Sequence, residues 1–190
     1  SFYGDAFATS DLRASANGYL GLGTSTYNYN DPPSWPKSSY LQTYTRWLAP
    51  MWHDFNPGGA AEGHIYNQTV GSEGNWRFVV TWDTWADTDE TQENIFQVQL
   101  HQATGDISYH YLQLDGVDEG SRVGINYGDG SRYTGFWYDG ADNTNGGGTY
   151  NANQDGPDGS LEGWRITYSY DEQSDSYQDD PIAVPAPGAI

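Results

Sequence analysis

The sequence predicts an antiparallel all-β domain, and the clearest sign is the segment from Phe96 to Tyr111. Apolar and polar residues alternate through residues 96–101 and again through 107–111, with a turn between them at Ala103–Asp106. Because successive side chains of a strand point to opposite faces, this pattern indicates a hairpin with one buried and one wet face. The chain also contains 16 Tyr and 8 Trp, which suit pleated strands, and no long stretch has apolar residues at helical spacing.

The remaining strands are expected where short apolar or aromatic runs lie between Gly, Pro, Asn and Asp. They are 2–7, 12–22 with a turn signal at Asn17-Gly18, 48–55 broken by Pro50, the pair 64–70 and 76–85, then 122–126 and 161–170. Residues 40–48 fit either a short helix or a strand. Loops are expected at 24–39, at 56–63 and through 129–159, where an aromatic patch at 136–138 interrupts a long Gly, Asp and Asn-rich region.

A single β-sandwich domain is expected over residues 1–170, because 190 residues can bury one sizeable core. Residues 171–190 are expected to be an acidic linker, flexible through 171–180, and a Pro, Ala and Val-rich tail that cannot form a central strand. No signal peptide or membrane span is visible. The chain begins at Ser1 inside an expected strand, which suggests a removed leader or missing earlier residues.

The net charge of −19, from 26 acidic residues against seven Lys and Arg, makes nucleic acid a poor partner. Phosphate binding needs clusters of Lys and Arg, and Lys37 is the only lysine. Such acidity favours divalent cations or a high-salt setting, or it is simply a soluble acidic surface. The absence of cysteine excludes disulfides, thiolate zinc sites and cysteine nucleophiles, while a core this large leaves an extracellular location open.

A calcium-binding loop is the clearest candidate for a metal site. Asn151, Asn153, Asp155 and Glu162 stand at positions one, three, five and twelve of a loop with Gly at six, the spacing of oxygen ligands in calcium loops. Asp158 is a further oxygen donor of the same segment, and Asp129, Asp139 and Asp142 are weaker candidates. The alternative is a solvated loop whose Asn, Asp and Gly serve turns.

Other candidate positions have plainer alternatives. Asn67-Gln68-Thr69 is a glycosylation sequon, although such tripeptides also arise by chance. His101 and His110 are expected to be neighbours across the hairpin, but the four histidines, His53, His64, His101 and His110, lack a zinc spacing and are read as surface residues. His53-Asp54 with a serine would resemble a catalytic triad, but no G-x-S-x-G elbow supports one.

Aromatic and acidic residues leave two further functions open. Trp35, Trp137 and Tyr138 stand in loop contexts and are candidates for stacking on sugar rings in a lectin-like module, whereas Trp82 and Trp85 are expected mainly to pack in the core. Paired carboxylates of a glycoside hydrolase are also conceivable among 26 acidic residues. Most of these lie in turns beside Gly, where solvent keeps their pKa values ordinary.

Three groups of segments resemble a β-sandwich module of secreted bacterial proteins that is related to the nidogen-like extracellular domain. They are 2–5 with 15–20, then 48–55 with 63–66, and finally 77–82 with 96–111 and 123–125. The resemblance implies a two-sheet, jelly-roll-like sandwich. The tail Val184-Pro185-Ala186-Pro187-Gly188-Ala189 is similar to the sorting signal of PEP-CTERM exported proteins, with Ala186 in place of the usual Glu. It implies export to the surface or the extracellular matrix.

The same resemblance implies a way to assemble. Related modules carry more strand before Phe2-Tyr3-Gly4-Asp5, and an incomplete strand exposes backbone groups that another chain could pair with. The assembly residues are then Ser1, Phe2 and Tyr3 at one end and Ile182, Val184 and Ile190 at the other, and a head-to-tail contact that does not close makes fibres. We expect a non-enzymatic structural or adhesive protein of the cell exterior, with a lectin-like module and a glycoside hydrolase as alternatives.

Overall fold

The computed structural model describes residues 2, 11–23, 46–56, 58, 63–86, 89–115, 121–129, 132–138, 161–178 and 182–185. Among these residues no helix is long and apolar enough to cross a membrane. The elements are strands, and they are β1 (Leu12–Ala14), β2 (Leu20–Leu22), β3 (Arg46–Trp52), β4 (His64–Val70), β5 (Arg77–Ala86), β6 (Asp89–His101), β7 (Ile107–Leu114), β8 (Ser121–Asn126), β9 (Tyr133–Tyr138), β10 (Trp164–Tyr168), β11 (Tyr170–Asp171), β12 (Ser176–Tyr177) and β13 (Ile182–Pro185).

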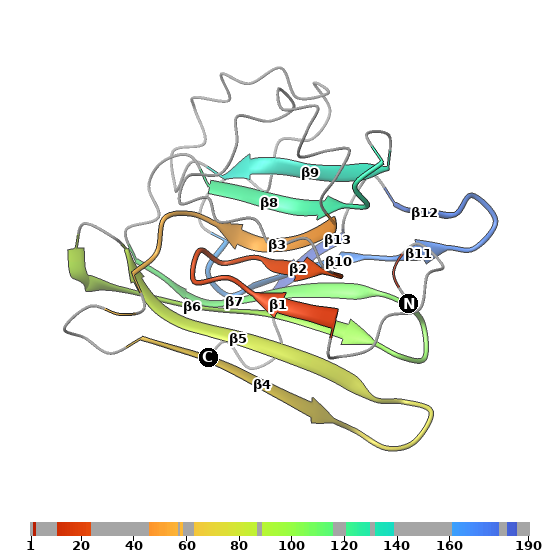
Figure 1. The fold of residues 1–190 in the computed structure, drawn as a ribbon, viewed down its shortest axis with the longest axis horizontal. Helices are drawn as coiled ribbons and strands as arrows, with labels where there is room; N and C mark the ends of the chain where they lie inside the picture. Colours follow the sequence, from red (N-terminus) through yellow and green to blue (C-terminus); the bar gives the residue numbers. More distant parts are fainter. Residues whose placement is uncertain are drawn as a thin grey trace.

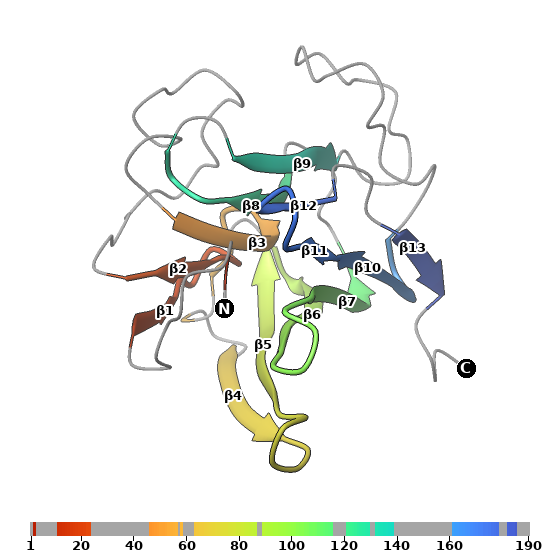
Figure 2. The ribbon, with the colours of Figure 1, turned by 90° about the vertical axis from the view of Figure 1, so that its right-hand side faces the viewer.

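The strands form two large sheets that face each other (Figure 1, Figure 2). The five-stranded sheet has the order β1-β2-β3-β8-β9, and the six-stranded sheet has the order β13-β10-β7-β6-β5-β4. Every neighbouring pair in both sheets is antiparallel. Strands β11 and β12 form a separate small hairpin. The expected all-β, two-sheet sandwich is therefore confirmed.

The core lies between the two large sheets and takes alternate residues from the facing strands. Burying one large apolar side chain contributes roughly 1.5–3 kcal/mol, so this layer supplies most of the driving force for folding. The fully buried members from the five-stranded sheet are Leu20, Leu48, Met51, Val123 and Ile125, and those from the six-stranded sheet are Trp82, Phe96, Val98, Ile107, Tyr109, Tyr111, Ile166 and Tyr168.

The predicted hairpin is formed by β6 and β7. Phe96 lies opposite Tyr111 and Val98 opposite Tyr109, and all four side chains are buried, as the alternation requires. The outer face is polar but drier than expected, since Ser108 is 2% exposed. The reason is local, because this small side chain lies within hydrogen-bonding distance of two larger histidine rings.

The turn signal Asn17-Gly18 separates β1 from β2, so the strand expected over 12–22 is two short strands. The Ser15 amide donates to the Tyr19 carbonyl at 2.8 Å. Gly18 has a φ of 73°, in the left-handed region that glycine favours. A Cβ at this position would also collide with the carbonyl oxygen of Met51. Both the backbone conformation and the close approach therefore require glycine here.

Pro50 does not end its strand, because β3 runs from Arg46 to Trp52. The pairing with β8 shifts at this point, since Ala49 lies opposite Gly124 and Trp52 opposite Arg122. Three steps along β3 match two along β8, which is a bulge. Bulges are where a sheet tolerates proline, since proline has no N–H to donate. The strand also settles the choice left open for residues 46–48.

The aromatic patch at 136–138 was expected in a loop, and this prediction is wrong, because these residues belong to β9. The strand pairs with β8 along its whole length, with Gly124 opposite Gly135. A Cβ on either glycine would collide with backbone atoms of the other strand. Close approach of the two backbones thus explains glycines that otherwise argue against a strand.

The chain continues after β10 in the hairpin β11–β12 and then in β13, at the edge of the six-stranded sheet. Within the hairpin, the Tyr170 hydroxyl donates to Asp175 Oδ1 at 2.8 Å, and this hydrogen bond raises the pKa of Tyr170 to about 12. Asp175 itself has a φ of 48°. The edge position of β13 fits a tail with proline at its end.

Candidate functional site

The border of the six-stranded sheet is formed by the C-terminal part of the chain. Strand β13 runs antiparallel to β10, with Arg165 opposite Val184 and Thr167 opposite Ile182. The other side of β10 pairs with β7, so β13 completes the hydrogen bonding of β10 and lies outermost (Figure 2). Edge strands present unpaired backbone groups, which makes this border a place where another chain can add a strand.

Three of the six predicted assembly residues, Phe2, Ile182 and Val184, are among the residues that the structure describes. Phe2 is 3% exposed, and its ring lies 5.7 Å from that of Tyr177 and 6.3 Å from that of Tyr127. Ile182 and Val184 belong to β13. Ser1, Tyr3 and Ile190 lie outside the described residues.

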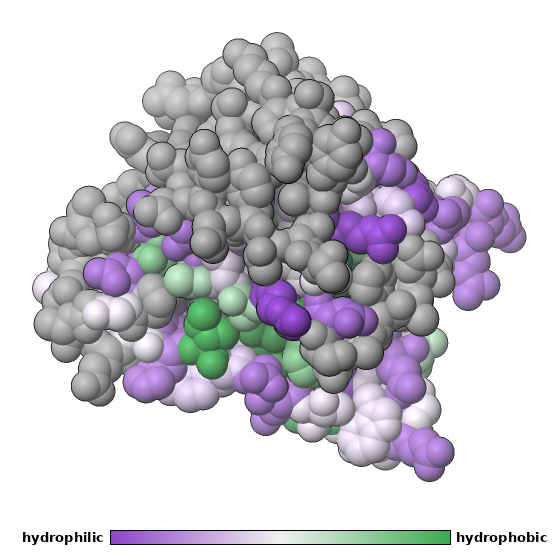
Figure 3. Space-filling model, in the orientation of Figure 1, coloured by the Kyte–Doolittle hydropathy of each residue, from purple (hydrophilic) through white to green (hydrophobic). Residues whose placement is uncertain are grey.

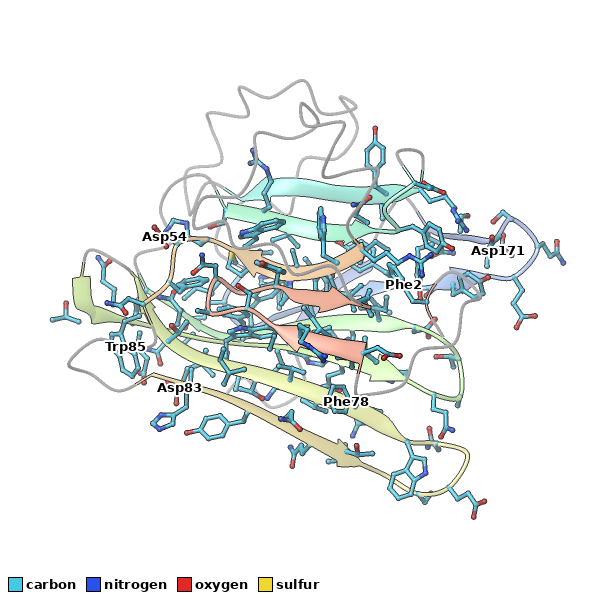
Figure 4. The ribbon with its side chains drawn as sticks, viewed as in Figure 1. Phe2, Asp54, Phe78, Asp83, Trp85 and Asp171 are labelled. Atoms are coloured by element: carbon cyan, nitrogen blue, oxygen red, sulfur yellow. The ribbon has the colours of Figure 1, made fainter. Side chains whose placement is uncertain are left out.

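A cavity of about 390 Å³ lies between the sheets near Phe2 and Phe78, which Figure 4 labels in the same part of the molecule. Its lining is mostly apolar and includes Leu12, Leu22 and Leu48 from the five-stranded sheet. Hydrophobic residues also reach the molecular surface between polar ones on the face seen in Figure 3. The cavity therefore offers mainly apolar contact, and the polar residues of its lining are Thr69, His101, Gln102 and Asp106.

A second aromatic cluster lies on the face of the five-stranded sheet that points away from the core. Trp47, Ala49 and Trp52 alternate along β3 with the core residues Leu48 and Met51. The cluster also includes Tyr19, whose ring centroid is 4.4 Å from that of Trp52.

Two of the three predicted sugar-stacking residues belong to the same five-stranded sheet as this second cluster. Trp137 and Tyr138 lie in β9, and the backbone register places Trp137 opposite Arg122, which in turn lies opposite Trp52. Trp35 lies outside the described residues. Trp82 packs in the core, as expected, and its indole N–H donates to the Ser15 carbonyl at 2.7 Å.

Most of the predicted calcium loop lies outside the described residues, namely Asn151, Asn153, Asp155 and Asp158. Glu162 is exposed, and its Oε2 lies 3.5 Å from the amide nitrogen of Leu114. Of the weaker candidates, Asp129 forms an ion pair with Arg132 at 2.7 Å, while Asp139 and Asp142 are not described. In the part of the chain that the structure describes, no three His, Asp or Glu residues are grouped as metal ligands. Calcium binding stays a prediction.

A serine does lie beside His53. The Ser121 hydroxyl is 3.2 Å from His53 Nδ1, and Asp54 follows in the sequence. Ser121 is fully buried, so a substrate cannot reach its hydroxyl. Asp54, Asp83 and Trp85 lie toward the end of the sandwich away from Phe2 (Figure 4).

His101 and His110 are close to each other, as expected, and the Ser108 hydroxyl lies between their rings. His101 Nε2 is 2.9 Å from the Ser108 hydroxyl, which is 3.0 Å from His110 Nε2. Burial, with smaller contributions from the charges of Arg165, His101 and Arg77, lowers the pKa of His110 to about 4. The two arginines were not anticipated, because they come from strands on either side of the hairpin.

Asn67, the predicted glycosylation residue, is exposed in the middle of β4 and lies opposite Val80 of β5. Strand β4 forms the other border of the six-stranded sheet. The Asn67 side chain is therefore accessible to solvent, and glycosylation stays a prediction.

The two antiparallel sheets and their bordering strands define an all-β sandwich module. A family model described as NIDO related matches residues 1–157, and the chain belongs to this NIDO-related family. The predicted nidogen-like relationship is thereby confirmed, and the family is one of an extracellular type. Neither a curated protein nor a solved structure matches the chain. The matched residues end before β10, so β10 and β13 lie beyond them.

Proposed function

We propose that the chain is a non-enzymatic structural or adhesive module of the cell exterior whose copies join by exchanging their C-terminal strand. The observation that carries this proposal is β13, a four-residue strand at the sheet border that pairs with β10. The family supports the extracellular setting. The buried hydroxyl of Ser121 supports a role without hydrolytic chemistry.

Exchange of β13 changes few contacts. The same strand from a neighbouring copy can make the same four residue pairs with β10, so the pairing energy is conserved when the strand moves between copies. The remaining cost is the entropy of joining two molecules, which falls as the protein concentration rises. If each copy gives its strand to the next, the contact is head-to-tail and propagates into a filament.

Mixing two single-cysteine variants tests this proposal, because the chain has no cysteine of its own. One variant is Thr167→Cys and the other, enlarged by a tag, is Ile182→Cys. These positions lie directly opposite each other, and paired Cα atoms in antiparallel strands are about 4.5–5.5 Å apart, which suits a disulfide. Exchange predicts a mixed covalent dimer on a non-reducing gel.

The matched control replaces Ile182→Cys with Ala183→Cys. Ala183 lies opposite Ile166, one position off in the register, so a cysteine at 183 is not paired with position 167 and should not form the disulfide. A mixed dimer with position 182 but not with 183 supports exchange. Equal yields for both, or no mixed dimer at concentrations where the native protein is oligomeric, overturn it.

A further inference from the structure

The outer face of the six-stranded sheet carries a polar network. Directly opposite residues of antiparallel strands share a face, so the register defines rows across the sheet. The two rows that lie between core positions are Arg165, His110, Gln97, Thr81 and Tyr66, and Thr167, Ser108, Gln99, Val79 and Gln68. At the end of these rows His101 lies opposite Arg77.

Hydrogen bonds hold the centre of this face in place. Arg77 donates to Gln99 Oε1 at 3.2 Å, and the Gln99 amide donates to Gln97 Oε1 at 3.2 Å. Beside them, His101 and His110 both lie within 3.0 Å of the Ser108 hydroxyl. Side chains already fixed in this way lose little conformational freedom when a ligand binds.

The two rows carry positive charge and no carboxylate, although the chain is strongly acidic. The net charge is −19 with seven Lys and Arg, and two of these, Arg77 and Arg165, lie here. Neither row contains Asp or Glu; beyond the rows lie Asp83, two residues past Thr81 on β5 and opposite His64, and Asp106, in the turn between β6 and β7. Arg165 Nε is buried and has no hydrogen-bond acceptor among the described residues, which leaves a charged donor unsatisfied. The Arg165 side chain as a whole is only partly buried, so an anionic group can reach the guanidinium and supply an acceptor.

An exposed aromatic pair lies at the other end of the first row. Tyr66 is 51% exposed, and its ring is stacked on that of His64 with centroids 5.5 Å apart. Such a flat exposed surface suits stacking against an apolar sugar face. Three strands separate β10 from β4, so Arg165 and Tyr66 are roughly 19 Å apart at the usual strand spacing.

We infer that this face binds an acidic glycan, with one carboxylate or sulfate group at Arg165, a second at Arg77 and a sugar ring on Tyr66. The amides of Gln68 and Gln97 on the same face match sugar hydroxyls, which both donate and accept hydrogen bonds. An acidic protein segment would need the arginines but not the exposed aromatic ring or the amide rows. The distance across the face selects an oligosaccharide.

Calorimetric titration of the full chain with three carbohydrate probes tests the inference: oligogalacturonate carries carboxylates, dextran sulfate carries sulfates, and dextran is neutral. Saturable binding to either acidic probe, at least about tenfold tighter than to dextran, is expected, and the tighter of the two identifies the anionic group. Absence of saturable binding to both acidic probes, or equal binding to dextran, overturns the inference.

Three variants locate the site. Arg165→Gln and Tyr66→Ala should each weaken binding about tenfold or more. Arg13→Gln, an exposed residue of β1 in the other sheet, changes the net charge equally and should leave affinity within about twofold. Tyr66 is exposed, so its variant stays informative even if Arg165→Gln disturbs folding. Equal losses in Arg13→Gln, or none in Tyr66→Ala, contradict the site. This result does not depend on strand exchange, which the mixed-disulfide experiment reads separately.

Discussion

The Tyr111 hydroxyl donates a hydrogen bond to the carbonyl oxygen of Pro50 at 2.7 Å, joining the two large sheets. Pro50 lies in the β3 bulge, where neither it nor Met51 has a pairing partner on β8. The bulge thus leaves a buried carbonyl outside the ladder, and a tyrosine of the opposite sheet satisfies it. A second tyrosine also joins the two sheets one strand away, since Tyr109 donates to the Gly124 carbonyl of β8 at 2.8 Å.

Tyr111→Phe is therefore expected to lower the free energy of unfolding by about 1–3 kcal/mol, because it leaves a buried carbonyl without a donor while keeping the ring. Urea unfolding followed by tryptophan fluorescence measures this. Tyr66→Phe is the control, since that side chain is 51% exposed and its change should stay within about 0.5 kcal/mol. Equal stabilities of the two variants would contradict the cross-sheet role.

Gly18 and Gly23 form a matched pair for a second prediction. Both have positive φ, 73° and 82°, so alanine at either position costs about 1–2 kcal/mol of backbone strain. A Cβ at Gly23 meets no atom within 4 Å, whereas one at Gly18 collides with the Met51 carbonyl. Gly18→Ala should therefore be less stable than Gly23→Ala by a further 1–3 kcal/mol or so in thermal unfolding. Equal melting temperatures would rule out the close contact.

The architecture could be predicted because it depends on local alternation. The hairpin β6–β7 and the strand pair β4–β5 follow from the alternation of apolar and polar residues along each strand. Strand β9 could not be predicted, because Gly135 and the Gly-rich segment around it indicate a loop until Gly135 is placed opposite Gly124 of β8. The bulge at Pro50 likewise depends on a partner strand far along the chain.

In the candidate sites, contacts within one hairpin could be predicted, whereas contacts that depend on the strand order could not. His101 and His110 lie in one hairpin, so their approach follows from the turn between them. Arg77 and Arg165 join them only through the strand order β10-β7-β6-β5, which no local pattern contains. The aromatic side chains of β3 are a comparable case, since their separation into core and outer clusters requires knowledge of which face meets the second sheet.

Calcium binding by residues 151–162 yields a third prediction, made from the ligand spacing alone. Millimolar calcium should raise the melting temperature, because a ligand bound only by the folded chain stabilises it. Asp155→Asn should abolish this increase, whereas Glu73→Gln, which removes the same charge at an exposed turn, should retain it. Scanning calorimetry with calcium or EDTA measures the effect, and an equal response of both variants would indicate nonspecific screening.

The fourth prediction concerns pH and rests on His110. Burial, with the charges of Arg165, His101 and Arg77, lowers its pKa from 6.5 to about 4 in the folded chain. Between these values the unfolded chain binds the additional proton, so stability rises with pH from about 4 to about 6.5 and is then constant. The pKa of His101 is lowered as well, by burial and then Arg77, with Asp106 opposing, and contributes in the same direction. After allowance for solvent screening, we expect about 1–2 kcal/mol from His110.

Unfolding curves at pH 4.5, 5.5, 6.5 and 7.5 test this dependence. His110→Gln cannot titrate, so the stability of this variant should change less between pH 4.5 and 6.5 than that of the native chain, by about 1–2 kcal/mol. His64→Gln is the matched control, because His64 is exposed on β4. Its pH profile should follow that of the native chain. A His110→Gln profile parallel to the native one would show that the outer-face network does not hold this histidine neutral.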